Sequence, residues 1–441
     1  MARAQIARQL SEHSGALFAF LARGWASFAG LVLVLLATTR LDAAEQGYFF
    51  TFQTLLQFQF LLELGFAVVL TQYVSHEWAH LHVEGGHVEG DPAARARLAG
   101  LIRLARRWYL GVSVGFLVIA APAGAGFFAW RGEAGVDWLL PWLALCGAQA
   151  IAIHYTPLPS MLEGTGDVAR SQRSLLTANI VAALGTWAAL LGGAGLWAAP
   201  VQVGLRALVA LALLLPATRV LRHIPVAAEE IRAHEPEWRD AFRRQQIRIA
   251  ASWAAGLLMF QSFTPIAFAV RGAVVAGQVG VLVQAFHAVN QLASAWLTAA
   301  QPQMGRLGSL GRIEELRHLV RVTLSRSLGT ALLLASASFA ALGLLEWLRP
   351  EYAERFGSLW MAAGFLTAAV VLQVTNVWTA VVRFQRQEPF VTVMWVSSAL
   401  VAASNLILGS LWGGTGIALG FLVVFAVVVA PWVGYVKRQY V

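Results

Sequence analysis

The most distinctive chemistry in this 441-residue chain lies in polar side chains that interrupt long apolar segments. Gln284, His287, Gln291, Ser294 and Thr298 recur at three- and four-residue spacing, which places them on one face of a helix. Such groups either join neighbouring helices, at under about 1 kcal/mol per hydrogen bond, or line a water-filled cavity. Five polar positions exceed what helix packing usually needs, so this polar stripe favours a cavity wall.

Other apolar segments contribute further polar groups. Gln46, Gln53 and Gln57 share one helix face, whereas Gln59 and Glu63 form another face of the same segment. Polar groups inside a bilayer are costly and mark substrate or ion pathways. The sequence therefore predicts a substrate cavity whose lining includes Arg23, Gln53, Gln57, Glu63, Gln261, Gln284, His287, Gln291, Gln373 and Asn376.

Arg23 lies near the middle of the first apolar segment, where a charged side chain costs about 3 kcal/mol. One interpretation is a cationic anchor for an anionic substrate group. The other is a structural role, in an ion pair with Glu63 or with the guanidinium reaching toward the membrane surface. The sequence leaves both interpretations open.

Two of the cavity residues can also titrate. Glu63 and His287 are candidates for binding a coupling proton, although a structural hydrogen bond is the commoner role for such a group. The sequence has no phosphate-binding glycine loop with a lysine, no metalloprotease helix and no nucleophile elbow. We therefore predict a protein that is not an enzyme and needs no cofactor, and whose transport is driven by a proton or sodium gradient or by the substrate's own gradient.

Four histidines between residues 76 and 87 raise the question of a metal site. Gly85, Gly86 and Gly90 would leave such ligands unorganised, so we interpret this stretch as a solvated loop of mixed charge without a metal. Cys146 is the only cysteine and lies in an apolar segment, which excludes disulfides and thiolate metal clusters.

The elements that must carry these residues are membrane-spanning helices. The chain is 58% hydrophobic and only 12% charged, where a soluble domain carries about a quarter charged residues. No small-residue cleavage site adjoins the first apolar segment, so we expect this segment to stay as an anchor. We predict about twelve spans at residues 15–38, 47–73, 108–130, 138–161, 172–193, 196–218, 249–270, 277–300, 326–348, 357–382, 390–411 and 414–436.

The basic residues give an independent test of this topology. Of the 32 Lys and Arg residues, 25 fall in the two termini and the alternate connections or within two residues of them, and only five fall in the opposite connections. Positive residues concentrate on the cytoplasmic side, so both termini are predicted to be cytoplasmic. Arginines in short loops beside apolar segments indicate membrane topology, so the net charge of +9 does not point to nucleic acid.

Two similar halves are predicted from a weak internal repeat. The glycine turn at residues 192–195 matches that at 413–416 with an offset of about 221 residues. Residues 44–48 correspond to residues 276–280. We predict an all-α membrane protein with bundles at 1–220 and 249–441, joined by a cytoplasmic amphipathic linker at 221–248. Six spans per half imply a pseudo-twofold axis along the membrane normal, with a central cleft between the halves.

Short motifs then resemble a known family. The runs Leu41-Asp-Ala-Ala-Glu-Gln-Gly-Tyr-Phe-Phe50, Leu61-Leu-Glu-Leu-Gly-Phe66 and Gln72-Tyr-Val74 resemble the opening of bacterial polysaccharide and O-antigen flippases, and both glycine turns resemble their superfamily. That superfamily is the multidrug/oligosaccharidyl-lipid/polysaccharide exporters. The resemblance implies a multi-pass protein of the bacterial inner membrane that flips an undecaprenyl-pyrophosphate-linked oligosaccharide from the cytoplasmic to the periplasmic leaflet by alternating access. Its partners would be that lipid-linked substrate, membrane lipids and other polysaccharide-assembly membrane proteins.

In this family Arg23 would serve a cationic cavity that receives the pyrophosphate, by its chemistry and helix position. Twelve spans argue against the lipid II flippases of the superfamily, which usually have fourteen. A cation-coupled multidrug exporter of the same fold is the first alternative, but it would be expected to carry an acidic residue in 15–38 or 249–270, and neither has one. A membrane polysaccharide polymerase or ligase is the second, but its typical large extracytoplasmic loop is missing from the predicted topology.

Overall fold

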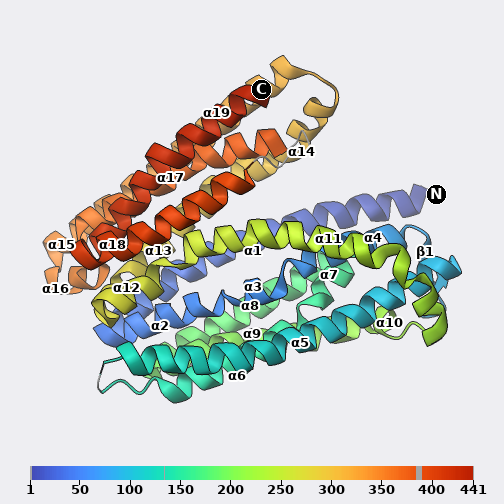
Figure 1. Cartoon of the computed structure of the whole chain (residues 1–441), viewed down its shortest axis with the longest axis horizontal. Coiled ribbons are helices and arrows are strands. Elements are labelled where there is room, and N and C mark those ends of the chain that lie inside the picture. Colours follow the sequence, from blue (N-terminus) through green and yellow to red (C-terminus); the bar gives the residue numbers. More distant parts are fainter. Residues whose placement is uncertain (1, 134, 384–389, 441) are drawn as a thin grey trace. The chain divides into compact units, whose positions relative to one another are not determined.

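A computed structural model of the chain describes residues 2–133, 135–383 and 390–440, and helices dominate it (Figure 1). Helices carry the spans because hydrocarbon offers no hydrogen-bond partners, so the backbone must satisfy itself. Up to the middle of the chain, the helices are α1 (Ala2–Arg40), α2 (Ala43–Leu56), α3 (Gln59–Glu63), α4 (Phe66–Trp78), α5 (Pro92–Arg131), α6 (Leu139–Tyr155), α7 (Pro157–Gly164), α8 (Val168–Leu191), η1 (Gly195–Trp197), α9 (Ala198–Ala217), α10 (Arg219–Arg222) and α11 (Ala228–Gln261).

The remainder of the described chain is also helical. It comprises α12 (Phe263–Arg271), α13 (Ala273–Ala293), α14 (Ala295–Ser309), α15 (Ile313–Leu348), α16 (Pro350–Ala353), η2 (Glu354–Phe356), α17 (Leu359–Arg383), α18 (Val391–Val423), η3 (Val424–Val429) and α19 (Ala430–Tyr440). The strands described are β1 (Leu81–Glu84) and β2 (His87–Gly90), which pair antiparallel as a hairpin.

The number of spans agrees with the sequence prediction. Within the described residues, nine helical stretches are long and apolar enough to cross a membrane, and two interrupted pairs raise the number to eleven. The 49-residue stretch Val391–Gln439 contains a non-helical residue, Gly413, with φ 63° and ψ −144°. It therefore corresponds to the two spans predicted at 390–411 and 414–436, and the predicted all-α membrane fold is confirmed.

The first compact unit comprises residues 1–26, 56–130 and 137–254. In this unit α9 packs against α6 and α8, and α4 packs against α7 (Figure 1). The second unit comprises residues 27–55, 131–136 and 255–441. There, α17 packs against α13, α15 and α18 (Figure 1). The boundaries predicted at residues 220 and 248, the pseudo-twofold axis and the central cleft stay predictions.

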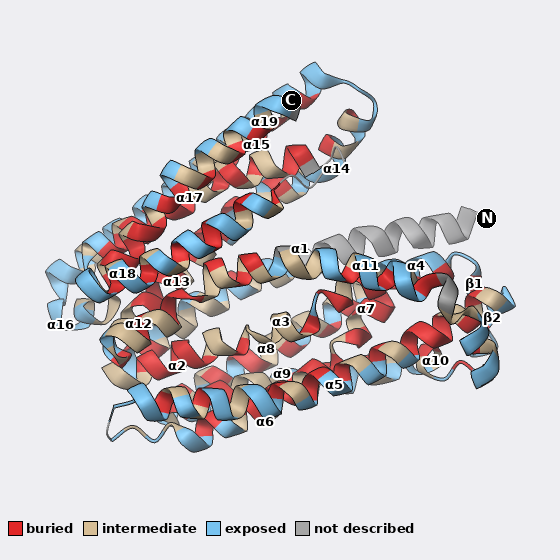
Figure 2. Cartoon of the chain, viewed as in Figure 1, coloured by how far each residue is buried: buried red, intermediate tan, exposed pale blue. Residues whose placement is uncertain are grey.

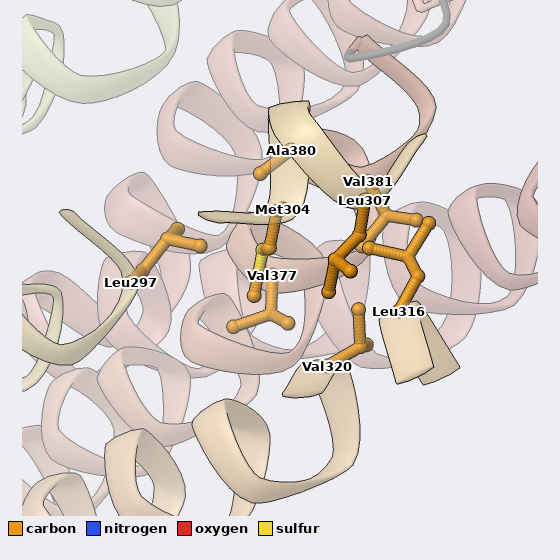
Figure 3. Packing of buried hydrophobic residues seen from close by; sticks show 8 residues of the cluster. All are labelled: Leu297, Met304, Leu307, Leu316, Val320, Val377, Ala380 and Val381. Atoms are coloured by element: carbon orange, nitrogen blue, oxygen red, sulfur yellow. The ribbon is translucent and has the colours of Figure 1, made fainter. Parts of the chain in front are cut away.

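Many helices are buried on one side and exposed on the other (Figure 2). In the second unit, a cluster of buried apolar side chains joins α14, α15 and α17 (Figure 3). Burying apolar surface in this way removes it from water or lipid and fixes the helices against one another by dense packing. The cluster consists of Leu297, Met304, Leu307, Leu316, Val320, Val377, Ala380 and Val381.

The linker predicted at 221–248 differs from an isolated surface helix. Its larger part forms the start of α11, which continues without a break into the span that follows. Trp238 and Phe242 are buried, and the Phe242 ring lies 4.9 Å from the Phe66 ring and 5.1 Å from the Tyr73 ring. The apolar face of this helix is therefore covered by protein of the first unit, because α4 supplies aromatic side chains that fit it.

The histidine-rich stretch is more ordered than the predicted loop. The β1–β2 hairpin occupies its centre, and Arg97 Nε at the start of α5 donates a 2.9 Å hydrogen bond to buried Glu77 in α4. The His76 and His80 rings lie 6.3 Å apart. Among the residues that the structure describes, no three His, Cys, Asp or Glu side chains are grouped as a metal site.

Candidate functional site

The predicted second span is interrupted where its polar residues lie. Gln57 is half-buried in the turn between α2 and α3, and Leu64 and Gly65 adopt left-handed backbone conformations, with φ of 53° and 67°, between α3 and α4. A Cβ at Gly65 would overlap the Ile249 side chain, so glycine also permits a close approach there. Interrupted membrane helices free backbone groups and commonly frame ion or substrate sites.

Glu63 is the last residue of α3 and is only 3% exposed. Within the described part of the chain, its Oε1 has no hydrogen-bond partner and the hydroxyl of fully buried Tyr109 has none either. The Tyr109 hydroxyl lies within electrostatic reach of this carboxyl. A buried carboxyl that lacks partners is costly as an anion, so it is a natural position for a proton or a cation to bind.

Hydrogen bonds join α6 to residues of α3 and α5 that lie one turn from Glu63 and from Tyr109. Gln149 Nε2 of α6 donates to Gln59 Oε1 of α3, and the Ser113 hydroxyl of α5 donates a 3.0 Å hydrogen bond to the Ala150 carbonyl. Helices α3, α5 and α6 therefore bring together a buried polar cluster with Glu63 as its acidic member. No ion pair involving Glu63 is found among the described residues, and both interpretations of Arg23, as a substrate anchor or as a structural residue, stay predictions.

A second buried polar cluster lies in the second unit around Gln373. Gln373 is completely buried in α17, and its Nε2 donates to Asn290 Oδ1 in α13 at 2.6 Å. Its Oε1 accepts hydrogen bonds from Ser327 at 2.9 Å and from Ser294 at 3.2 Å. The Gln373 amide is thus engaged at both ends by protein, which favours a role in joining helices over direct contact with substrate.

The polar stripe residues within α13, hereafter the α13 stripe, are Gln284, His287 and Gln291, and they differ from Gln373 in burial and in hydrogen bonding. Gln284 and His287 are half-buried and Gln291 is exposed, while no side-chain hydrogen bond is present at these three residues within the described chain. Half-buried Gln261 and Asn376 share this property. Polar groups that are neither sealed in the core nor satisfied by protein have hydrogen-bonding capacity left for water or for a hydroxyl-rich ligand.

The remaining predicted residues lie in the first two helices. Arg23 is exposed on α1, in the part of that helix that belongs to the first unit. Gln53 is half-buried on α2, in the part that belongs to the second unit. In the described part of the second unit, Gln373 is satisfied by protein whereas Gln284, His287 and Gln291 are not, and the single cavity lined by all ten residues stays a prediction.

Sequence reasoning did not select several residues that complete these clusters. Tyr109 and Gln149 complete the Glu63 cluster, and Asn290 and Ser327 complete the Gln373 cluster. Asn290 follows His287 by three residues and precedes Ser294 by four, so its helical spacing to the stripe was a signal that could have found it. Single serines and tyrosines in apolar segments carry no sequence signal of their own.

Comparison with known proteins places this architecture among solved transporters. No protein-family profile matches the sequence, and no curated protein matches it. The fold is similar to that of the lipid II flippase MurJ in an inward closed conformation, with a TM-score of 0.69 and 9% identity over 96% of this chain and 87% of that chain.

Two MATE transporters are also similar in fold. An inward-facing multidrug resistance MATE transporter of the MOP superfamily has a TM-score of 0.60 and 13% identity, over 94% of this chain and 98% of that chain. The eukaryotic MATE transporter AtDTX14 has a TM-score of 0.60 and 12% identity, over 98% of each chain. The chain therefore has the fold of the multidrug/oligosaccharidyl-lipid/polysaccharide exporter superfamily, as its sequence motifs predict.

Proposed function

We propose that this multi-pass membrane protein is a transporter that moves an undecaprenyl-pyrophosphate-linked oligosaccharide from the cytoplasmic to the periplasmic leaflet. It works by alternating access and is not an enzyme. The observation that carries the proposal is the open α13 stripe, where Gln284, His287 and Gln291 present hydrogen-bonding groups and no carboxylate. Hydroxyl-rich sugars need many donors and acceptors, whereas a cationic drug is held by carboxylates and aromatic rings.

The charge of the first span supports the same substrate. Arg23 is exposed on α1, and a guanidinium can bind the oxygens of a pyrophosphate through two parallel hydrogen bonds. The fold shared with a lipid II flippase is compatible with a large lipid-linked substrate. The distribution of arginines supports a bacterial inner-membrane location with both termini cytoplasmic, and membrane lipids and other polysaccharide-assembly proteins are its expected partners.

The test is transbilayer movement in liposomes that contain the purified full-length protein. The substrate is a short-chain polyprenyl-pyrophosphate oligosaccharide with a fluorophore, and movement is followed by quenching with a membrane-impermeant reductant. Wild type should flip the lipid, Arg23→Ala should slow flipping by about tenfold or more, and Arg23→Lys should retain part of the rate because it keeps the charge. Absence of flipping by well-folded wild type, with or without a proton or sodium gradient, contradicts the proposal.

A second candidate function is cation-coupled export of small molecules. It is favoured by the fold shared with MATE transporters and by the buried carboxyl of Glu63, which has an unpartnered Oε1 among the described residues. The same liposomes discriminate the two functions. Gradient-driven efflux of a cationic dye, without flipping of the lipid-linked sugar, would favour the exporter.

A further inference from the structure

Two adjoining cavities lie at one end of the second unit, apart from the α13 stripe and the Gln373 cluster. The larger has a volume of about 580 Å³ and lies between the start of α13, the α16–η2 connection and the turn at Gly413. The smaller has a volume of about 150 Å³ and lies between the starts of α2 and α13 and the same connection. Gln278 and Glu354 line both cavities.

The walls of these cavities are held by hydrogen bonds that involve the backbone of the α16–η2 connection. Gln278 Nε2 donates to the Glu354 carbonyl at 2.8 Å, and Gln46 Nε2 donates to the Arg355 carbonyl at 3.1 Å. Across the larger cavity, the Ser358 and Thr415 hydroxyls lie 3.0 Å apart. These contacts fix the connection against α2 and α13, so the cavities are part of the folded unit.

Hydrogen-bonding atoms in the smaller cavity are left without partners. Gln46 is only 1% exposed and lines this cavity, yet its Oε1 has no hydrogen-bond partner in the described structure. Arg355 lines the same cavity, and its buried Nη1 also lacks a partner there. A buried orphan acceptor and a buried orphan donor are each costly, and a group that both donates and accepts satisfies them together. A hydroxyl group is such a group.

The chemistry of the larger cavity agrees with a hydroxyl-rich ligand. Glu346 and Glu354 offer carboxylate acceptors, Ser358 and Thr415 offer hydroxyls, and Trp412 offers an aromatic face that is 62% exposed. Carboxylates beside an aromatic ring suit the polar edge and the apolar C–H face of a sugar ring. Across both cavities the charged lining consists of Glu346, Glu351, Glu354 and Arg355, which disfavours an anionic group such as pyrophosphate.

We propose that these two cavities form a saccharide-binding subsite that holds uncharged sugar residues of the substrate, with Gln46 and Arg355 binding one hydroxyl and Trp412 contacting a ring. The inference rests on the proposed function and extends it by separating the sugar contact from the pyrophosphate contact. The loops that frame the subsite are among the connections that hold only five of the Lys and Arg residues, and these connections are predicted to face the periplasm. The subsite would therefore hold the saccharide on the side to which it is delivered.

The first experiment measures saccharide binding to the full-length protein in nanodiscs by saturation-transfer NMR. The probes are maltotriose and triacetylchitotriose, each at about 10 mM because a saccharide without its lipid is expected to bind in the millimolar range. Wild type should transfer saturation to at least one probe. Gln46→Leu, Thr415→Val and Trp412→Ala should each weaken that binding by about tenfold, because each removes one predicted contact.

Trp360→Ala is the matched control. Trp360 is 74% exposed at the start of α17 and lines neither cavity, so its removal should leave saccharide binding unchanged. Thermal unfolding of each variant reports folding separately, and Thr415→Val is nearly isosteric in case Gln46→Leu unfolds. No saturation transfer to either probe in wild type overturns the subsite, and so does equal transfer in wild type and all three cavity variants.

A flipping assay with two lipids separates the subsite from the proposed function. Gln46→Leu should slow flipping of the sugar-bearing polyprenyl pyrophosphate but leave the bare polyprenyl pyrophosphate unaffected. If wild type flips the sugar-bearing lipid and Gln46→Leu flips it equally fast, the subsite is wrong and the flippase stands. If wild type binds saccharide at Gln46 but flips neither lipid, the subsite stands and the proposed function is wrong.

Discussion

Gln373 Nε2 donates a 2.6 Å hydrogen bond to Asn290 Oδ1, which joins the buried interior of α17 to that of α13. The network continues through Ser327 of α15, whose hydroxyl lies 2.9 Å from both Gln373 Oε1 and the Ala293 carbonyl and can donate to either. Ala293 is the last residue of α13, where the helix is interrupted before α14. The Ser327 side chain therefore offers a donor to a backbone carbonyl at the interruption, where the helix leaves carbonyls without a helical partner.

We expect Gln373→Leu to destabilise the protein by about 1–3 kcal/mol, because it leaves the buried Asn290 Oδ1 without its donor and removes an acceptor of the Ser327 hydroxyl. Thermal unfolding in detergent measures the effect. Asn376→Leu, one turn further along α17, is the control. Asn376 is half-buried and makes no side-chain hydrogen bond within the described residues, so this change should cost under about 0.5 kcal/mol. Equal losses for both variants would mean that the network contributes nothing.

Close packing of α2 on α13 depends on glycine. Residues 44–48 and 276–280, which the sequence pairs as repeat counterparts, contact each other there, and a Cβ at Gly280 would overlap the Phe50 ring. Gly280→Ala should therefore destabilise the protein by about 1–3 kcal/mol through overpacking. In Gly343→Ala, where a Cβ meets nothing within 4 Å, stability should stay the same or rise by up to about 1 kcal/mol. Chemical or thermal unfolding measures the stability of both variants. A Gly280→Ala protein as stable as wild type would contradict the close approach of α2 and α13.

The hairpin between α4 and α5 depends on the ion pair of Glu77 and Arg97. The Glu77 side chain is 5% exposed and its Oε2 lies 2.9 Å from Arg97 Nε. Glu77→Gln should weaken the junction by about 1–3 kcal/mol and speed hydrogen exchange in residues 81–90. Glu84→Gln removes a carboxylate that is 78% exposed and should leave exchange at the wild-type rate. Exchange that is unchanged by both substitutions would show that the hairpin is held by other contacts.

If Glu63 binds the coupling proton or cation, Glu63→Gln should abolish the dependence of transport on a pH or sodium gradient. The amide is nearly isosteric, and replacing a buried carboxyl that has an unpartnered Oε1 in the described structure should not lower thermal stability. The measurement is the flipping rate in liposomes with and without an imposed gradient. Glu229→Gln, an exposed position in α11, is the control. A gradient dependence that survives in Glu63→Gln assigns this carboxyl a structural role.

Hydropathy predicted which segments become helices, because a bilayer leaves the backbone no other partner than itself. The same physical constraint explains the glycine turns. Helix α8 ends at Leu191 and Gly193 has a φ of 77°, and the long α18 is interrupted at Gly413, as the two glycine motifs predict. Both turns are local: they need positive φ only at glycines, Gly193 and Gly195 in the first turn and Gly413 in the second, and glycine adopts such angles without steric cost.

Only the tertiary structure decided which polar side chains have hydrogen-bond partners within the protein. Periodicity puts Gln373 and Gln284 on helix faces, but it cannot show that Asn290 and Ser327 saturate the first while the second stays open. Gln46 was expected to share a face with Gln53, yet folding buries it against the Arg355 carbonyl, 309 residues away, with its Oε1 unpartnered among the described residues. Hydropathy fixes a residue's depth and helix face, whereas its partners depend on how distant helices pack, which no local pattern encodes.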